Sequence, residues 1–86
     1  MKKVFIPRGV CSRKYEIVLE DGIIKDIAIM GGCHGNLQGI AALLIGQKAE
    51  DVVDRLSGIR CGFRPTSCPD QISIALREAL EEEKNA

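Results

Sequence analysis

Apolar and polar side chains alternate along the first third of the chain, as they do in a half-buried β-strand. The apolar positions of the clearest stretch share one predicted face: Tyr15, Ile17 and Leu19. A shorter apolar run, residues 2–6, precedes this stretch and ends at Pro7. Asp21-Gly22 favours a tight hairpin, because glycine readily adopts the positive φ that such a turn needs, and residues 23–30 then predict the returning strand. The pattern predicts two or three antiparallel strands.

The rest of the chain repeats its apolar residues at helical spacing. The first predicted helix has Asn36 as its N-cap and Gly46 as its stop. A second, shorter helix covers residues 49–57. The third starts at about Pro69 and runs into the eighties, where residues 81–83 are all glutamate and predict a frayed last turn. We therefore expect an α+β fold in which an N-terminal antiparallel sheet packs against about three C-terminal helices.

The length of the chain limits its core. Its 86 residues predict one domain, residues 1–86, that buries only roughly 60–65% of its unfolded surface. Domains this small often gain stability from a metal or from disulfides, and four cysteines suffice for either. The basic start has too few apolar residues before Pro7 for a signal peptide, and no stretch is long enough to span a membrane. We expect a cytoplasmic location, where reducing conditions favour metal binding or thiol redox chemistry over disulfides.

The charge balance argues against nucleic acid as a partner. Twelve basic residues match twelve acidic ones, and the aromatic residues are few: Phe5, Tyr15 and Phe63. A nucleic-acid-binding protein normally has a basic excess or a platform of aromatic rings. We therefore expect neither nucleic acid nor a membrane as a partner.

The four cysteines are the main candidates for chemistry. Cys11, Cys33 and Cys68 each lie where one predicted element ends and another begins, and Cys61 lies in the same loop as Cys68. Such junctions can converge at one edge of a sheet, so four ligands can meet without a Cys-x-x-Cys pair. Cys68 also falls at the predicted cap of the last helix, ahead of Pro69, where the helix dipole favours a thiolate. We expect Cys11, Cys33, Cys61 and Cys68 to bind zinc or an iron–sulfur cluster.

Other interpretations of the same residues stay open. Cys61 and Cys68 could form a redox-active dithiol, or all the cysteines could be inert and support a module for protein interaction. His34, beside Cys33, could replace Cys61 as a ligand, donate a hydrogen bond to a ligand, or lie on the surface. Four arginines lie within four residues of a cysteine and could offset the charge of metal-bound thiolates: Arg8, Arg13, Arg60 and Arg64.

The string Thr66-Ser67-Cys68-Pro69-Asp70 is the literal signature of the TSCPD domain family, and the chain resembles the small four-cysteine, stand-alone branch of that family. Further matching positions are Gly9-Val10-Cys11-Ser12, Gly31-Gly32-Cys33, Gly35-Asn36 and Cys61-Gly62. Relatives of this domain occur at the C-terminal end of ribonucleotide reductases, especially the adenosylcobalamin-dependent type. The resemblance implies ribonucleotide reductase as a partner and a link to DNA replication. It does not imply an enzyme acting alone, because the reductase reaction requires a large barrel, a radical cysteine and a nucleotide site.

The chain also resembles, more distantly, the iron–sulfur cluster assembly scaffold proteins. The corresponding positions are Cys11, Gly22-Ile23-Ile24, Cys33 and Cys68. This resemblance implies a three-stranded antiparallel sheet with its ligands gathered at one end, and an iron–sulfur carrier as an alternative function. The chain differs from the scaffold pattern by lacking a histidine before the third cysteine and by carrying Cys61. Four thiols favour permanent tetrahedral binding. Whether the chain forms a homodimer stays open.

Overall fold

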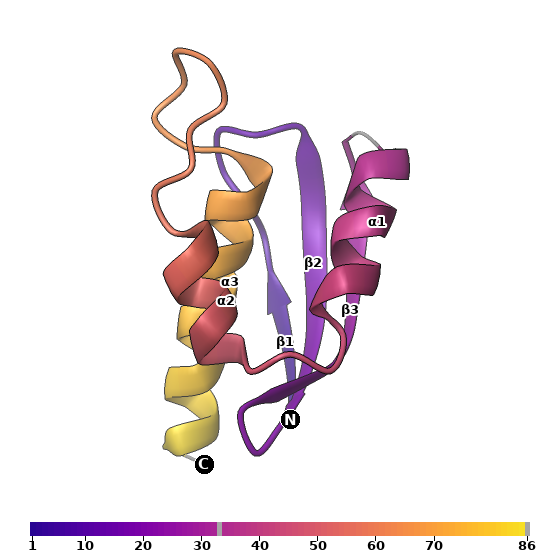
Figure 1. Cartoon of the computed structure of the whole chain (residues 1–86), viewed down its shortest axis with the longest axis vertical. Helices are drawn as coiled ribbons and strands as arrows, with labels where there is room; N and C mark the ends of the chain where they lie inside the picture. The colour runs from indigo at the N-terminus through magenta and orange to yellow at the C-terminus, as the bar shows by residue number, and fades with distance from the viewer. Residues whose placement is uncertain (33, 86) are drawn as a thin grey trace.

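The computed structural model describes residues 1–32 and 34–85. Three strands form one antiparallel sheet in chain order: β1 (Lys2–Phe5), β2 (Ser12–Glu20) and β3 (Ile23–Gly31). Three helices follow: α1 (His34–Leu44), α2 (Ala49–Leu56) and α3 (Cys68–Lys84). Figure 1 shows α1 beside β3. It shows α3, with α2 packed against it, near β2 and β1. The predicted α+β fold, with an N-terminal three-stranded sheet, is confirmed.

The turn between β2 and β3 has the predicted hairpin geometry. Asp21 and Gly22 both have positive φ, at 52° and 77°. A two-residue turn with this backbone matches the twist of the flanking strands.

A β-bulge explains why the apolar residues of β3 do not alternate strictly. The pairing of β2 with β3 shifts between Val18 and Leu19, so that Lys25 stands as an extra residue in β3. Ile24 and Ile27 lie three residues apart, yet both point into the core, with exposed fractions of 0% and 4%. The bulge therefore places on one face two side chains that a regular strand would direct to opposite faces.

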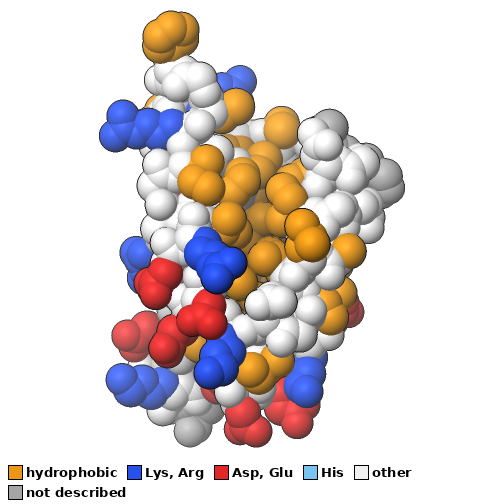
Figure 2. Space-filling model, viewed as in Figure 1, with side chains coloured by type: hydrophobic (Ala, Val, Ile, Leu, Met, Phe, Trp, Pro, Cys, Tyr) orange, Lys and Arg blue, Asp and Glu red, His pale blue; other side chains and the backbone are white. Residues whose placement is uncertain are grey.

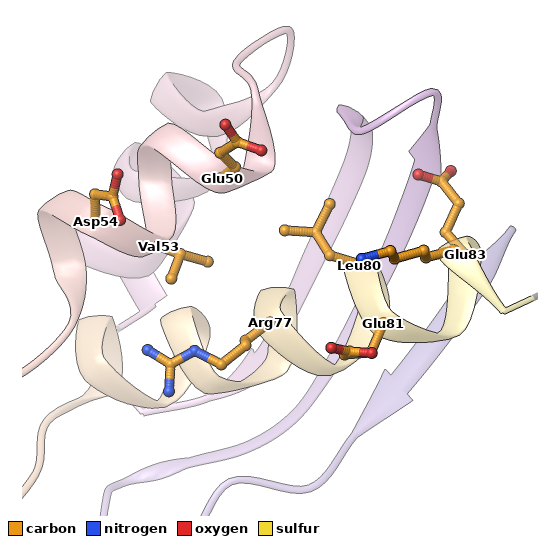
Figure 3. A pocket seen from close by; sticks show the side chains of 8 residues that line it. Glu50, Val53, Asp54, Arg77, Leu80, Glu81 and Glu83 are labelled. Carbon is orange, nitrogen blue, oxygen red and sulfur yellow. The ribbon is translucent and has the colours of Figure 1, made fainter.

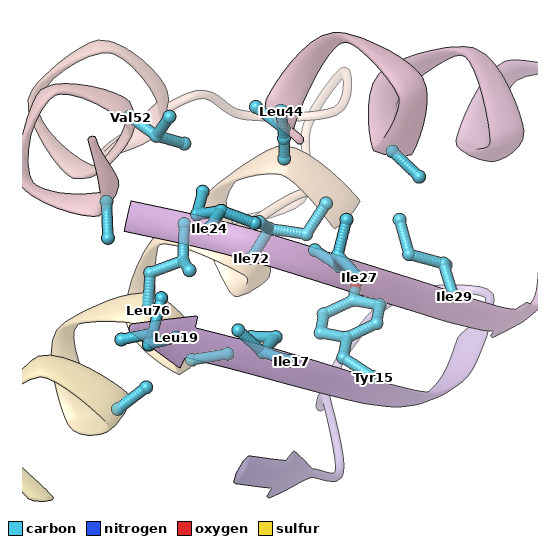
Figure 4. Packing of buried hydrophobic residues seen from close by; sticks show 14 of the residues in the cluster. Tyr15, Ile17, Leu19, Ile24, Ile27, Ile29, Leu44, Val52, Ile72 and Leu76 are labelled. Atoms are coloured by element: carbon cyan, nitrogen blue, oxygen red, sulfur yellow. The ribbon is translucent and has the colours of Figure 1, made fainter. Parts of the chain in front are cut away.

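The core fills the space between the sheet and the helices. Figure 4 shows the isoleucine, leucine and tyrosine side chains of β2 and β3 meeting those of the helices. The largest fully buried apolar side chains are Tyr15, Ile17, Leu19, Ile24, Ile72 and Leu76. Burying one such aliphatic side chain contributes about 1.5–3 kcal/mol, so this layer supplies the main driving force for folding.

Two helices begin earlier than the sequence predicted. α1 begins at His34, so Asn36 lies inside the helix and the prediction that it is the N-cap is wrong. Ser67 is the N-cap of α3, which makes Cys68 the first helical residue and Pro69 the second. Proline is tolerated there because the N–H groups of the first turn have no helical partner.

The last turn of α3 does not fray, contrary to the prediction from its glutamates. The helix continues to Lys84, and contacts with the sheet hold its acidic side chains. Lys3 of β1 forms an ion pair with Glu82, and the backbone N–H of Gly22 donates to Glu83 at 2.9 Å. These partners offset the unfavourable interaction of carboxylates with the negative end of the helix dipole.

Both ends of the chain lie at the same end of the molecule. The N-terminal ammonium of Met1 donates to the carbonyl of Leu19 at 2.8 Å, and α3 ends nearby (Figure 1). The junctions that carry the cysteines lie at the opposite end. Within residues 1–32 and 34–85, none of the helices has the length and apolar character needed to cross a bilayer.

Candidate thiolate site

Two cysteines far apart in the sequence meet at the end of the sheet opposite the chain termini. Cys11 ends the β1–β2 loop, and Cys68 is the first residue of α3. Their Sγ atoms lie 3.8 Å apart. Cys11 is exposed and Cys68 is half-buried, so the pair is open to solvent on one side.

The hydroxyl groups of Ser12 and Tyr15 form hydrogen bonds with Cys68. Ser12, only 4% exposed, donates from its hydroxyl to Cys68 Sγ at 3.4 Å. The same hydroxyl lies 2.6 Å from the Tyr15 hydroxyl, which donates to the carbonyl of Cys68 at 3.3 Å. Burial raises the pKa of Tyr15 to about 12, so its hydroxyl stays protonated at neutral pH.

These contacts favour the thiolate form of Cys68. Partial burial opposes ionisation of the thiol, but hydrogen bonds from Ser12 and Cys11 outweigh it and lower the pKa of Cys68. The first turn of α3 adds the positive end of a helix dipole. Cys68 is therefore suited to act as a metal ligand or as a nucleophile.

The junction between β3 and α1 passes directly beside Cys11. Gly32 has a φ of +71°, and a Cβ added there would lie 3.1 Å from Cys11 Sγ and 2.9 Å from Leu37. Only glycine fits this passage without displacing its neighbours. The backbone therefore reaches the thiol pair one residue before Cys33. Cys33 itself and the side chain of His34 lie outside the described residues.

Cys61 is not part of the thiol pair. It lies in the loop between α2 and α3, where its N–H donates to the carbonyl of Thr66 at 3.2 Å and its carbonyl accepts from the N–H of Arg64 at 3.0 Å. Its side chain is exposed. Among the described residues, no three or more His, Cys, Asp or Glu side chains gather closely enough to hold a metal ion. The structure thus brings together Cys11 and Cys68 of the predicted four.

Polar residues around Cys68 connect the first turn of α3 to the preceding loop. Asp70 accepts from the Thr66 hydroxyl at 2.5 Å and from the N–H of Gly58 at 2.7 Å. These two hydrogen bonds, with Arg77 nearby, hold the pKa of Asp70 below its usual value despite partial burial. Ser67 accepts from the N–H of Asp70 at 3.2 Å. The Thr, Ser and Asp of the TSCPD string therefore position the helix start from which Cys68 projects.

Gln71 connects this helix start to the loop that carries Cys11. Its side-chain amide donates to the Thr66 hydroxyl at 2.9 Å, and its carbonyl oxygen accepts from the N–H of Arg8 at 3.1 Å. Gln71 is 7% exposed, so both hydrogen bonds are shielded from water. One amide side chain thus links the loop that carries Cys11 to the loop that precedes α3.

Sequence reasoning missed Ser12 and Gln71. Strict alternation would place Arg13, rather than Ser12, on the same face as Tyr15. The pairing of β2 with β3 shifts between Ser12 and Lys14, and this irregularity turns Ser12 inward. The only available signal for Gln71 was a polar residue on the apolar side of the last helix.

Comparison with known families identifies the family of this chain. The family model of the TSCPD domain matches residues 1–80, and the chain belongs to the TSCPD domain family. Comparisons with curated proteins and with solved structures gave no match. The likeness to iron–sulfur scaffold proteins stays a prediction.

Proposed function

We propose that this TSCPD domain is a metal-binding module in which Cys11 and Cys68 are two ligands of one metal atom. The distance between their Sγ atoms supports this proposal. Two thiolates bound to one tetrahedral zinc at about 2.3 Å are separated by about 3.8 Å. The observed separation is 3.8 Å. The thiols can therefore bind one metal atom with little rearrangement.

Cys33 and Cys61 are the proposed remaining ligands. Gly32 lies against Cys11, and Cys33 follows Gly32 directly in the sequence. Cys61 lies in an exposed loop seven residues before Cys68, and ligation by it requires this loop to move toward the pair. A bound zinc would cross-link the junctions that carry the ligands and stabilise the fold, and an iron–sulfur cluster is the alternative occupant.

Metal content of native protein tests the proposal. Protein purified without oxygen should contain about one equivalent of zinc, or iron and sulfide with visible absorption. Cys11→Ser and Cys68→Ser should each lose most of the metal and should melt at a lower temperature. Ser57→Ala, in the α2–α3 loop, is the control for metal content: it should retain its metal even though it loses the hydrogen bonds of Ser57 with Ser73 and Arg77. Less than half an equivalent of any metal in the native protein would refute the proposal.

A chelator distinguishes a structural metal from an incidental one. If the metal holds the junctions together, its removal should lower the melting temperature of native protein and leave that of Cys68→Ser unchanged. Equal melting of native protein with and without chelator would show that the cysteines support the fold without a metal, as in a pure interaction module.

A second candidate function is dithiol redox chemistry, and the structure favours Cys11 over Cys61 as the partner of Cys68. The Cys68 thiolate would attack a small disulfide, releasing one thiol. The Cys11 thiolate would then attack the mixed disulfide, forming the Cys11–Cys68 bond and releasing the second thiol. Treatment of metal-free protein with oxidised glutathione, followed by peptide mapping without reductant, tests this exchange. Thiols that react no faster than free cysteine at neutral pH would eliminate it.

We also infer an accessory role toward ribonucleotide reductase. The support is the TSCPD string at residues 66–70 and the family match over residues 1–80, because the resemblance to this family implies a link to such reductases. The expected result is saturable binding of the metal-loaded chain to the purified reductase, measured by calorimetry. Heat signals no larger than those of dilution would contradict this role.

A further inference from the structure

The loop between α2 and α3 carries a fully exposed aromatic side chain between two cations. Phe63 has a relative exposure of 110%, which is more than that of any other large apolar side chain among the described residues. Arg60 and Arg64 flank it and are also exposed. Residues 58–66 contain no acidic residue. We call residues 60–64 the tip; Figure 1 shows this loop projecting beyond the rest of the molecule at one end.

A groove of complementary character lies between α2 and α3. Its volume is about 530 Å³. Figure 3 shows Val53 of α2 and Leu80 of α3 on its inner side, with carboxylates from both helices around them. The acidic residues lining it are Glu50, Asp54, Glu81 and Glu83, and the basic ones are Arg77 and Lys84. The groove therefore combines an apolar floor with a net negative rim.

The tip and the groove match each other in charge and in chemistry. Two arginines give the tip a charge of +2. Four acidic and two basic residues give the groove lining a net charge of −2. An aromatic side chain buries about 150–250 Å² when it docks, and an apolar floor is the surface that it requires. In Figure 2 the carboxylates of this face lie in its lower half, whereas the upper end shows basic side chains and no acidic ones. The neutral chain is thus polarised along its length.

The geometry points to a homodimer in which the tip of each copy docks in the α2–α3 groove of the other. The loop projects above α2 and α3 (Figure 1), at the end where Figure 2 shows basic and no acidic side chains. The acidic residues that line the groove belong to α2 and α3. Two copies placed side by side in opposite directions therefore bring both tips to both grooves. Such a contact is reciprocal and closes at two copies. The antiparallel arrangement also aligns opposite charges.

The contact should be weak and salt-dependent. Two phenylalanines bury about 300–500 Å² together. This is below the roughly 1,200–2,000 Å² of a standard stable interface. We expect a dimer of the metal-free protein, in which Cys61 is unligated and the tip projects, in rapid exchange with monomer and detectable in the upper micromolar range by sedimentation velocity. Its dissociation constant should rise with added salt, because the charges that flank the contact are exposed.

Charge-swap variants test the pairing of these two surfaces. Arg60→Glu with Arg64→Glu makes the tip negative, and Asp54→Lys with Glu81→Lys makes the groove positive. Each double variant should dissociate at least about tenfold more easily than native protein. The quadruple variant restores opposite charges and should recover dimerisation. If either double variant failed to dimerise because it was unfolded, combining the substitutions would not restore dimerisation.

Substitutions of exposed apolar side chains distinguish specific docking from nonspecific hydrophobic association. Phe63→Ala should weaken the dimer at least tenfold, whereas Leu43→Ala, which removes a side chain that is 76% exposed on α1, should leave it unchanged. Monomer at all concentrations up to millimolar, growth beyond the dimer, or failure of the quadruple variant to recover would overturn the proposal. Metal content is measured on every variant, so that failure of the metal site is recognised separately from failure of the dimer.

Discussion

The carboxylate of Asp70 should contribute measurably to stability, although it lies outside the hydrophobic core. It accepts one hydrogen bond from the Thr66 hydroxyl and one from the N–H of Gly58, and it sits in the first turn of α3. Asp70→Asn preserves the shape of the side chain but replaces one acceptor oxygen by a donor. The amide oxygen can still accept from the N–H of Gly58, but the amide nitrogen only donates, so the hydrogen bond from the Thr66 hydroxyl to a charged oxygen is lost. The favourable charge at the helix start is lost with it.

The expected cost follows from these two losses. A hydrogen bond to a charged group contributes about 1.5–3 kcal/mol, and a carboxylate near a helix N-terminus about 0.3–1 kcal/mol. Because Asp70 is partly exposed, we expect a value near the lower end, about 2 kcal/mol. In a domain of this size, that change lowers the melting temperature by roughly 8–16 °C.

The pH dependence identifies the carboxylate as the source of the effect. The pKa of Asp70 is lowered in the folded state, so its contribution is fully present above the unfolded-state pKa of about 3.9 and is lost as the pH falls through the folded-state pKa. The difference in stability between native protein and Asp70→Asn should therefore be largest at neutral pH and should shrink as the solution is acidified.

Urea denaturation followed by circular dichroism, repeated from neutral to acid pH, measures this difference. Asp54→Asn, which removes an exposed carboxylate on α2, is the matched control and should change stability by less than about 0.5 kcal/mol. A cost for Asp70→Asn below that value at neutral pH would refute the reasoning. A cost that did not change with pH would assign the effect to shape rather than to charge.

Three further predictions concern the core, a glycine and a hydroxyl. Leu76→Ala should destabilise the protein by about 2–5 kcal/mol in urea denaturation, because Leu76 is fully buried; a cost under 1 kcal/mol would show a loosely packed core. Gly32→Ala should destabilise by more than about 1 kcal/mol, because of its positive φ and crowded surroundings, whereas Gly39→Ala, in open space inside α1, should stabilise by up to about 1 kcal/mol. Ser12→Ala should raise the pKa of Cys68 by removing a donor to its sulfur, so the rise of alkylation rate with pH in metal-free protein should move to higher pH; an unchanged profile would contradict the role of this hydroxyl.

The strands and helices were largely predictable because their apolar periodicity is local. Tyr15, Ile17 and Leu19 alternate and are all buried as expected, and the Asp21-Gly22 turn has the predicted backbone. The ends of the helices were less predictable. A capping preference competes with contacts that only the folded chain makes, as the start of α1 ahead of Asn36 shows.

The candidate site was predictable in part. Placement of the cysteines at junctions led to the expectation that all four thiols meet; the Sγ atoms of Cys11 and Cys68 lie 3.8 Å apart, and the four-cysteine site stays a prediction. It could not indicate which thiols meet, since that depends on strand irregularities and loop paths. The inward turn of Ser12 depends on a local shift in pairing, and the amide contacts of Gln71 depend on tertiary packing. Neither has a periodic pattern in the sequence.

The shared position of the two chain ends has a practical consequence for any experiment that must attach the protein to something. The N-terminus and the end of α3 lie at the end of the molecule remote from the β1–β2 loop and the start of α3, which carry Cys11 and Cys68 (Figure 1). An affinity tag, a surface linker or a larger host polypeptide joined at either end would leave Cys11 and Cys68 facing outward. Immobilised protein should therefore expose this thiol pair to solution as free protein does.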